Sequence, residues 1–305
     1  MKRKLVKQGA ATMMISLPSK WIKANKLGKG DEIDLIEDNG KLVVGAEIKE
    51  GKKEIEIELN EENKQDIGNL LTHIYRRGFD RVVLKGQHKG ILRELREVVE
   101  SLLLGFEITS VGKDKLVIEN ISEPTEQKYD IMFKKTFQII KETQEMIKED
   151  YEKNKFQNFQ DITDLRKQQD RFILFCRRLL SKRNTGKNQA LHWELLIFLM
   201  HIQHRYWYLY QYLSKNKIEK SKQVKELLDV LIHYFNLYEN AYFEKKISSI
   251  HKINKMKKEY YMGKCLKALE KSRGKESVIL AYIREIFRIM QIGTSPILSE
   301  ILEKD

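Results

Sequence analysis

Proline is scarce in this chain, with only three among 305 residues. Long disordered linkers are usually rich in proline and polar residues, so disorder is expected only at the termini and in short joints. Hydrophobic residues make up 41% of the sequence and charged residues 33%, a balance typical of a globular protein with a highly charged surface. The length allows two or three domains.

Long apolar segments are also missing. No stretch approaches the roughly 20 uncharged apolar residues that a membrane-spanning helix requires. The chain begins Met1-Lys2-Arg3-Lys4, and no apolar signal-peptide core follows these residues. We therefore expect a cytoplasmic protein without membrane insertion.

Cysteine is nearly absent, and enzyme signatures are not found. Cys176 and Cys265 lie in segments of helical periodicity without Cys-x-x-Cys spacing, which favours buried thiols over a disulfide or a zinc site. There is no Gly-x-x-x-x-Gly-Lys-Ser/Thr loop, no His-Glu-x-x-His motif and no glycine-flanked nucleophilic serine. We expect no enzymatic activity. Residues 85–90 follow a predicted strand and precede a predicted helix, so their amides could hold an anion, or form an ordinary connection.

Positive charge is in excess. The chain has 57 lysines and arginines against 44 aspartates and glutamates, a net charge of +13. This balance favours an anionic partner such as DNA, RNA or a membrane surface. Lysine, isoleucine and asparagine are abundant throughout, as in proteins from AT-rich genomes, so charge alone does not select nucleic acid.

Residues 1–48 show the pattern of two hairpins with a short helix between them. The first hairpin is predicted from the strand-like runs 3–7 and 11–16, and the helix begins near Pro18. The second joins strands 32–37 and 41–44 across Asn39-Gly40, a pair that favours a type I′ turn. Because two hairpins in fewer than 50 residues bury little apolar surface, we expect this domain to dimerise.

Residues 49–124 are predicted to form a small α/β domain. Strand and helix periodicities alternate in the order strand 53–59, helix 61–77, strand 81–84, a helix closed by Gly105, and strands 106–110 and 115–119. Pro124 marks the boundary, since the residue before a proline avoids helical geometry. Residues 125–305 then carry six apolar stripes of helical spacing, which predict six helices in two three-helix bundles. A break is expected at residues 293–296. The fold class is therefore multidomain α+β.

Three N-terminal segments carry a family resemblance. They are Lys2-Arg3-Lys4-Leu5-Val6-Lys7-Gln8-Gly9, Ile15-Ser16-Leu17-Pro18-Ser19-Lys20-Trp21, and Leu27-Gly28-Lys29-Gly30-Asp31-Glu32-Ile33. Together they resemble the AbrB/MazE/SpoVT swapped-hairpin fold as it occurs at the front of archaeal PhoU-like phosphate uptake regulators. Residues 106–108 and 121–124 also resemble those proteins. The resemblance implies an all-α PhoU-like domain behind the α/β domain.

In the resembled fold, two chains exchange hairpins to close one β barrel, whose basic face lies against DNA. The DNA-binding residues that this implies here are Lys2, Arg3, Lys4, Lys7, Ser19, Lys20 and Lys23. The chemistry is reasonable, because lysine and arginine neutralise phosphates and release counterions. The alternative is that these lysines form a solvated surface or lie beside the acidic residues of segment 31–38.

The resemblance also implies a metal site, which the residues do not favour. PhoU-like helices carry a carboxylate four residues before an aspartate, but here Arg166 precedes Asp170, and Met200 and His204 stand on the next helix. We therefore expect no metal cofactor. Asp170, His201 and His204 remain candidate ligands, since positions 201 and 204 share a helix face. The aromatic surroundings favour packing roles for the histidines instead.

These observations predict a homodimeric DNA-binding transcription regulator with a helical sensor or docking domain. By resemblance, the regulated process is phosphate uptake, and a phosphate-transporter component is an implied partner. The alternative is a dimeric scaffold that docks a transporter or signalling partner and binds no DNA.

Overall fold

The computed structural model describes residues 2–9, 12–38, 41–46, 52–122, 127–182 and 188–303. The chain divides into two compact units, residues 1–53 and 54–305, which we call the N-terminal unit and the main unit. The expected boundary after residue 48 lies outside the described residues. The expected boundary at 122–125 also lies outside them, apart from Ser122.

The N-terminal unit contains the expected hairpins and short helix. In chain order, its elements are β1 (Leu5–Gln8), β2 (Thr12–Ile15), α1 (Ser19–Ala24), β3 (Ile33–Asp38) and β4 (Lys41–Ala46). Each hairpin is antiparallel, with Leu5 opposite Ile15 and Asp38 opposite Lys41. The predicted Asn39-Gly40 turn lies outside the described residues. The two hairpins form separate two-stranded sheets, and the single chain shows no closed barrel in its described part.

Helix α1 ends earlier than the glycines suggest. The sequence pattern places its end at Gly28 or Gly30, whereas the structure ends it at Ala24. Lys26 adopts a left-handed conformation with φ of 55°, and the backbone amide of Leu27 then donates to the oxygen of Ile22 at 3.0 Å. A lysine thus takes the position that glycine usually fills after a helix.

The main unit begins with a four-stranded sheet. Its strands, in chain order, are β5 (Glu54–Glu58), β6 (Arg81–Lys85), β7 (Phe106–Val111) and β8 (Lys115–Asn120). The spatial order is β5-β6-β8-β7, with β5 parallel to β6 and the other pairs antiparallel. Alternate residues such as Val82 and Leu84 face one buried cluster, because successive strand side chains point to opposite faces.

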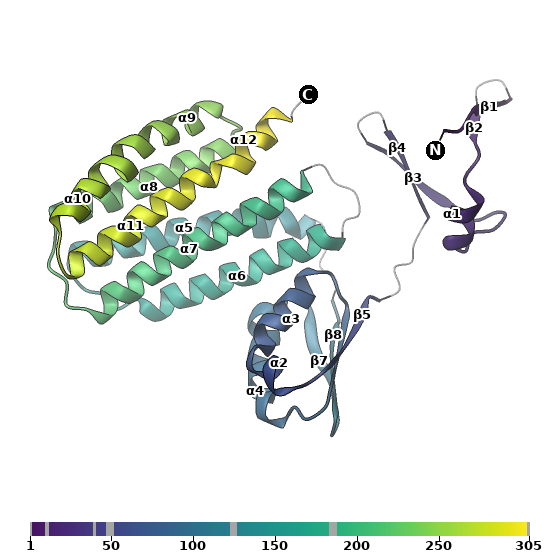
Figure 1. Ribbon diagram of the computed structural model, residues 1–305, viewed down its shortest axis with the longest axis horizontal. Coiled ribbons are helices and arrows are strands. Elements are labelled where there is room, and N and C mark those ends of the chain that lie inside the picture. The colour runs from purple at the N-terminus through teal and green to yellow at the C-terminus, as the bar shows by residue number, and fades with distance from the viewer. Residues whose placement is uncertain are drawn as a thin grey trace. The chain divides into compact units, whose positions relative to one another are not determined.

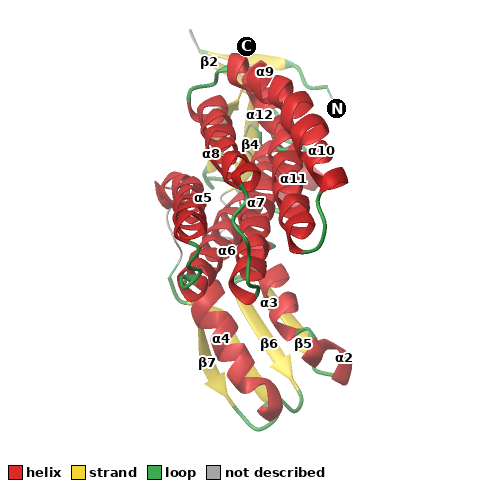
Figure 2. Cartoon of the chain, turned by 90° about the vertical axis from the view of Figure 1, so that its left-hand side faces the viewer, coloured by secondary structure: helices red, strands yellow, loops and turns green. Residues whose placement is uncertain are grey.

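Helices cover one face of this sheet, as Figures 1 and 2 show. They are α2 (Glu61–Gln65), α3 (Ile67–Arg76), the 3₁₀ turn η1 (Lys89–Ile91) and α4 (Leu92–Leu102). The single helix expected over 61–77 is therefore wrong. Asn60 and Asn63 cap α2 reciprocally, and Asp66 leaves helical geometry with φ of −123°. The chain turns there, so that Ile67 becomes fully buried.

The rest of the main unit is helical. Its elements are α5 (Gln127–Lys153), α6 (Phe159–Lys182), α7 (Gln189–Lys215), α8 (Lys222–Phe243), α9 (Ile247–Met256), the π-helix η2 (Lys257–Lys264), α10 (Cys265–Lys271), α11 (Lys275–Ile292) and α12 (Thr294–Leu302). The expected break at 293–296 is confirmed, because α11 ends at Ile292. One of the six predicted helices covers about residues 252–269, and the structure interrupts it with η2, where a Cβ on Gly263 would lie 3.0 Å from the oxygen of Lys258.

The long helices share one hydrophobic core. Helices α5, α6 and α7 pack against one another, and α8 packs against α9 and α11. Further contacts join α7 to α11 and α5 to α8, and one continuous cluster contains buried residues from α5 to α12 (Figure 1). None of the helices within the described ranges combines the length and apolar character that crossing a membrane requires.

The α/β layer and the long helices meet at the C-terminal half of α6, which packs against α3 and α4. Arg178 has no exposed surface and donates hydrogen bonds to the backbone oxygens of Tyr75 at 3.2 Å and Phe79 at 2.5 Å. It also pairs with Asp80 at 2.5 Å, which Lys182 joins at 2.7 Å. Because these oxygens lie at the end of α3 and just after it, one arginine ties α6 to the α/β layer.

Candidate nucleic-acid interface

All seven predicted DNA-binding residues lie on the surface of the N-terminal unit. Three precede β1, one lies on β1, and three lie on α1: Lys2, Arg3 and Lys4, then Lys7, then Ser19, Lys20 and Lys23. Helix α1 follows Pro18, whose φ of −66° already suits a helix start. The structure thus exposes every predicted residue.

The basic side chains of this set are not neutralised by the residues that the structure describes. Among the described residues, none of them forms an ion pair or a hydrogen bond with a carboxylate. Asp31, from the acidic segment 31–38, instead accepts a hydrogen bond from the backbone amide of Gly28 at 2.6 Å. No ion pair joins these lysines to Asp31, Glu32 or Asp34, and the side chains of Glu37 and Asp38 lie outside the described ones. The other alternative, a solvated surface, is compatible with the exposure of the set.

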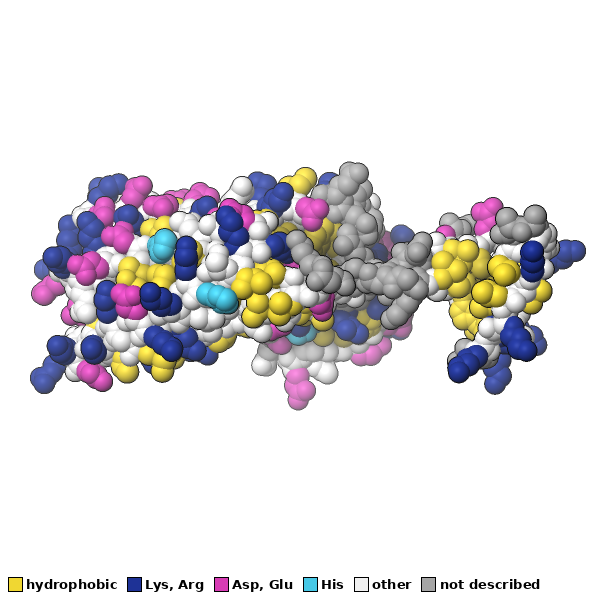
Figure 3. Space-filling view, turned by 90° about the horizontal axis from the view of Figure 1, so that it is seen from above, with side chains coloured by type: hydrophobic (Ala, Val, Ile, Leu, Met, Phe, Trp, Pro, Cys, Tyr) yellow, Lys and Arg dark blue, Asp and Glu magenta, His cyan; other side chains and the backbone are white. Residues whose placement is uncertain are grey.

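Apolar side chains of the first hairpin are exposed beside these cations. Leu5 is 66% exposed, Val6 56% and Met13 60%, although strand neighbours point to opposite faces. None of the described residues of the N-terminal unit is buried. In Figure 3, hydrophobic side chains gather on this unit next to lysine and arginine side chains. A two-stranded hairpin with apolar residues on both faces is marginal in water, so these strands need a further partner surface.

Of the three candidate metal ligands, Asp170 and His204 lie within hydrogen-bond distance of each other. Nε2 of His204 lies 2.8 Å from Oδ1 of Asp170, as expected for facing helices α6 and α7. His201 on α7 retains much of its exposure, and partial desolvation of its ring, together with the charges of neighbouring basic groups, lowers its pKa. The described residues contain no group of three or more histidine, cysteine, aspartate or glutamate side chains that could hold a metal ion. A histidine–aspartate pair alone does not make a metal centre.

Several other aromatic residues of α7, and His192, contact neighbouring helices. His192 lies 2.8 Å from the hydroxyl of Tyr129, and Tyr206 and Tyr210 are buried in the core. Trp193 and Trp207 instead lie over arginines of α6, with the Arg166 guanidinium carbon 4.6 Å from the centre of the Trp207 ring. These arginine–tryptophan contacts were not predicted from the sequence. Arginines at helical spacing on α6, opposite tryptophans on α7, are the signal that was available.

The loop at residues 85–90, considered above as a possible anion site, begins with hydrogen bonds to its own chain. The backbone amide of Gly86 donates to the oxygen of Asp114 at 2.8 Å, and the side chain of Gln87 donates to the carboxylate of Asp114 at 3.0 Å. The first amide of the loop is therefore occupied.

The two cysteines are buried, as predicted. Burial raises the pKa of Cys265 to about 12 and also raises that of Cys176. A thiol with such a pKa stays protonated near neutral pH, so neither cysteine is a ready nucleophile.

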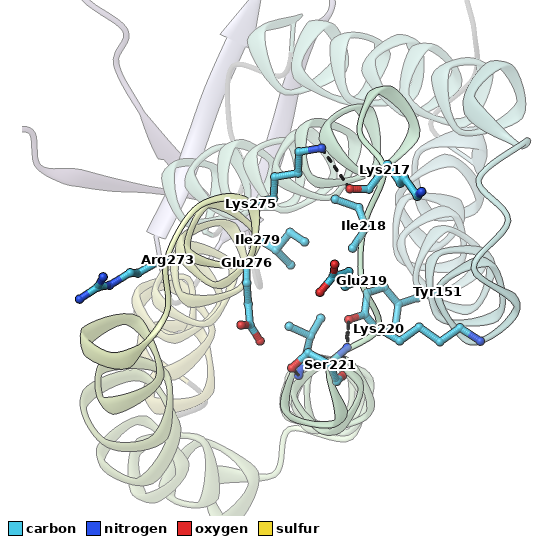
Figure 4. Close-up of a pocket in the computed structure, with 11 residues that line it drawn as sticks. Tyr151, Lys217, Ile218, Glu219, Lys220, Ser221, Arg273, Lys275, Glu276 and Ile279 are labelled. Atoms are coloured by element: carbon cyan, nitrogen blue, oxygen red, sulfur yellow. Dashed lines mark hydrogen bonds between the residues drawn. The ribbon is translucent and has the colours of Figure 1, made fainter.

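A cavity of about 710 Å³ lies at one end of the long helices (Figure 4). It is lined by the connection 217–221, the C-terminal part of α5, and the starts of α8 and α11. Two helix N-termini favour an anion there. In Figure 4, however, Glu219 and Glu276 point into the cavity while Arg273 points away. The cavity thus contains its own negative charge and brings together no nucleophile with a base.

One of the comparisons with known proteins found a match, and it lies mainly in the N-terminal unit. Residues 6–62 match the family model described as antidote-toxin recognition MazE, bacterial antitoxin. Comparison with curated proteins and with solved structures found no match. The match covers the hairpins, α1 and the start of the α/β layer, so this part of the chain is similar to MazE-type antitoxin domains.

Proposed function

We propose that the chain is a non-enzymatic, homodimeric DNA-binding regulator in the cytoplasm. The observation that carries the proposal is a set of six cationic side chains without acidic partners among the described residues, on a unit whose first hairpin exposes apolar side chains. Similarity of residues 6–62 to the MazE family supports it further. In the proposed dimer, hairpins of two chains close one barrel, which covers the apolar side chains and places two copies of the basic set along one duplex.

Phosphate uptake is the process that we propose for this regulator. Its support is the resemblance of the N-terminal segments, such as residues 15–21 and 27–33, to archaeal PhoU-like regulators. In this view, the main unit is a sensor or docking domain, and a phosphate-transporter component is a partner. A map of crosslinked DNA in cells grown at high and low phosphate tests this part, and unchanged occupancy at both levels contradicts it.

DNA binding is tested by titrating duplex DNA across a salt series. The dimer should bind with an affinity that falls as salt rises, and the slope should decrease by about 0.9 for each phosphate that is no longer neutralised. Replacing Lys2, Arg3 and Lys4 with glutamine should therefore flatten the slope. The matched control replaces Lys128, Lys134 and Lys135, which are exposed on α5, with glutamine. Equal, salt-insensitive binding by all three proteins would reject the proposal.

A second candidate function is protein docking without DNA, which the description of the matched family as toxin recognition favours. In that case, the barrel serves for dimerisation and for contact with a protein partner. Deletion of residues 1–48 separates the two functions. Loss of duplex affinity on deletion supports the regulator, whereas a full-length chain that binds no duplex supports docking alone, and affinity that survives the deletion contradicts a DNA role for the hairpins. The helical far-UV signal should persist, because residues 54–305 form their own compact unit.

A further inference from the structure

The segment from α9 to α10 forms one continuous helical rod on the outside of the long helices. The residues at the joins between α9, η2 and α10 all keep right-handed helical backbone angles. Figures 1 and 2 show α9 and α10 at the outer edge of the long helices. One side of the rod packs against α8 and α11 and buries Ile250, Ile253, Cys265 and Ala268. The opposite side carries the exposed residues of the segment.

The exposed side of this segment is rich in lysine. Residues 247–271 contain seven lysines and two glutamates. Glu259 already pairs with Lys264 at 3.1 Å, and Glu270 is exposed. Five further lysines are exposed and form no ion pair within the part of the chain that the structure describes, and we call them the α9–α10 lysines: Lys252, Lys255, Lys258, Lys267 and Lys271. Their positive charge favours an anionic partner.

Two apolar side chains lie among these lysines. Met262 is 58% exposed and Leu266 39%, and residues four apart lie on the same side of a helix. The neighbouring rings of Tyr260 and Tyr261 are half-buried. The segment therefore exposes apolar groups next to a positively charged surface, a combination typical of helices that lie on a membrane.

An anionic lipid surface matches both features. Its headgroups attract lysines, and apolar side chains can enter the boundary between headgroups and acyl chains. A nucleic-acid backbone would also attract the lysines, but phosphates offer no apolar contact to Met262. A second copy of this segment would bring lysine against lysine. We propose that the α9–α10 lysines, together with Met262 and Leu266, bind the main unit to an anionic membrane surface.

Binding of this kind is peripheral. The inner side of the segment belongs to the hydrophobic core of the long helices, so the segment lies on the membrane surface and only its outer side chains contact lipid. The surface belongs to the main unit, and the proposal therefore does not depend on the DNA binding proposed for the N-terminal unit.

Sedimentation of the full chain with lipid vesicles tests the proposal. Vesicles of phosphatidylcholine with about one third phosphatidylglycerol should bind the protein, vesicles of phosphatidylcholine alone should not, and the bound fraction should fall as salt rises. Replacing Lys255, Lys258 and Lys267 together with glutamine should weaken binding about a hundredfold, because each lysine near an anionic surface contributes about fivefold. The matched control makes the same change at three exposed lysines from separate parts of the main unit and should bind nearly as wild type does: Lys89, Lys113 and Lys167.

The apolar contact has a test of its own. Met262→Gln keeps the length of the side chain and should weaken vesicle binding about fivefold, because less apolar surface is removed from water. Its affinity for duplex DNA should not change. Val111→Thr, at a valine of β7 that is 49% exposed, is the control. Vesicle binding by Met262→Gln as tight as that of wild type contradicts a contact with lipid.

Four other outcomes overturn the proposal. No binding to either kind of vesicle, or equal binding to both, excludes recognition of anionic lipid. An equal loss in the control lysine variant reduces the effect to net charge. Vesicle binding that depends on Lys2, Arg3 and Lys4 instead of the α9–α10 lysines assigns it to the N-terminal unit. Loss of duplex affinity, with vesicle affinity unchanged, in the triple α9–α10 variant assigns these lysines to nucleic acid.

Discussion

The two units of the chain use apolar residues in opposite ways. In the N-terminal unit, Leu5, Met13 and Leu35 are each more than half exposed, and none of the described residues is buried. In the main unit, aromatic side chains such as Phe137 and Phe287 have no exposed surface. Both units contain strands or helices of ordinary amphipathic sequence, so residue type does not explain the difference.

The difference follows from how much surface each architecture can cover by itself. Two separate hairpins and a helix of six residues leave their described side chains exposed or half-buried, with none fully buried. Helices of 22 to 27 residues, α5 to α8, cover one another along their whole apolar stripes. The main unit therefore builds a buried core within one chain, whereas the proposed function assigns the exposed strands of the N-terminal unit to a dimer contact.

The largest expected effect is on the joint within the main unit. Arg178→Ala removes the pair with Asp80 and the hydrogen bonds to the oxygens of Tyr75 and Phe79. It should lower the free energy of unfolding by about 3 to 5 kcal/mol, because Asp80 is left buried with fewer partners. Urea unfolding measures the loss. Arg93→Ala, at an exposed pair with Glu97, should change little. An equal effect of the two changes would show that the joint is not stabilising.

The second effect tests the open surface of the N-terminal unit. Leu5→Asp places a charge in the proposed dimer contact and should weaken dimerisation by about 2 to 3 kcal/mol, the energy of burying one leucine. Sedimentation equilibrium measures the dissociation constant, while unfolding of the main unit should stay unchanged. Thr12→Asp, an exposed polar position of the same hairpin, is the control. A wild-type chain that stays monomeric at high concentration would refute the proposed dimer.

The third effect concerns close packing in the main unit. A Cβ at Gly293 would lie 2.8 Å from the Tyr238 hydroxyl and 3.1 Å from Cβ of Phe198. Gly293→Ala should therefore destabilise the main unit by about 1 to 3 kcal/mol. Gly90→Ala meets no atom within 4 Å and is the matched control for calorimetry. Similar unfolding midpoints for the two variants would mean that the break between α11 and α12 is loosely packed.

The smallest effect is a pH dependence of the main unit. Burial alone would raise the pKa of Glu300, but His192 and Lys245 lower it below its ordinary value of 4.5. A carboxylate with a lowered folded pKa stabilises the protein above pH 4.5, and this contribution is lost as the pH falls further. Glu300→Gln should cost about 1 kcal/mol at pH 7 and less near pH 3. Glu97→Gln, at an exposed position, should show no such trend, and parallel pH profiles for both variants contradict the assignment.

Much of the secondary structure could be predicted from local patterns. The apolar stripes of α5 to α8 repeat every three or four residues, and Asn39-Gly40 follows a strand-like run, so helices and hairpin are visible in short windows. The break at Asp66 was missed, because the apolar spacing continues through it and only the caps at Asn60 and Asn63 reveal the first helix end. The π-helix after Met256 was missed for a similar reason, since its side-chain pattern remains helical.

The same distinction between local pattern and tertiary packing applies to the basic residues. Lys2, Arg3 and Lys4 are recognisable in the sequence as a run of charged residues, and the structure exposes all three. Arg177 and Arg178 look like solvent-exposed residues of a helix, although they lie between Cys176 and Leu179, which are buried. A charged residue is expected to be exposed unless another helix or strand packs over it. The sequence does not show which helix or strand packs there.

The sequence by itself determined most helices and strands of this protein, the basic character of its N-terminal segment and the similarity of that segment to MazE-type domains. Local periodicity and turn chemistry act over a few residues, so they can be read directly from the chain. Only the tertiary structure decided that Arg178 enters the α/β layer, that Arg177 stacks on Trp193, and that Asp170 meets His204. Contacts between residues far apart in sequence depend on how helices pack, and packing is a property of the whole core.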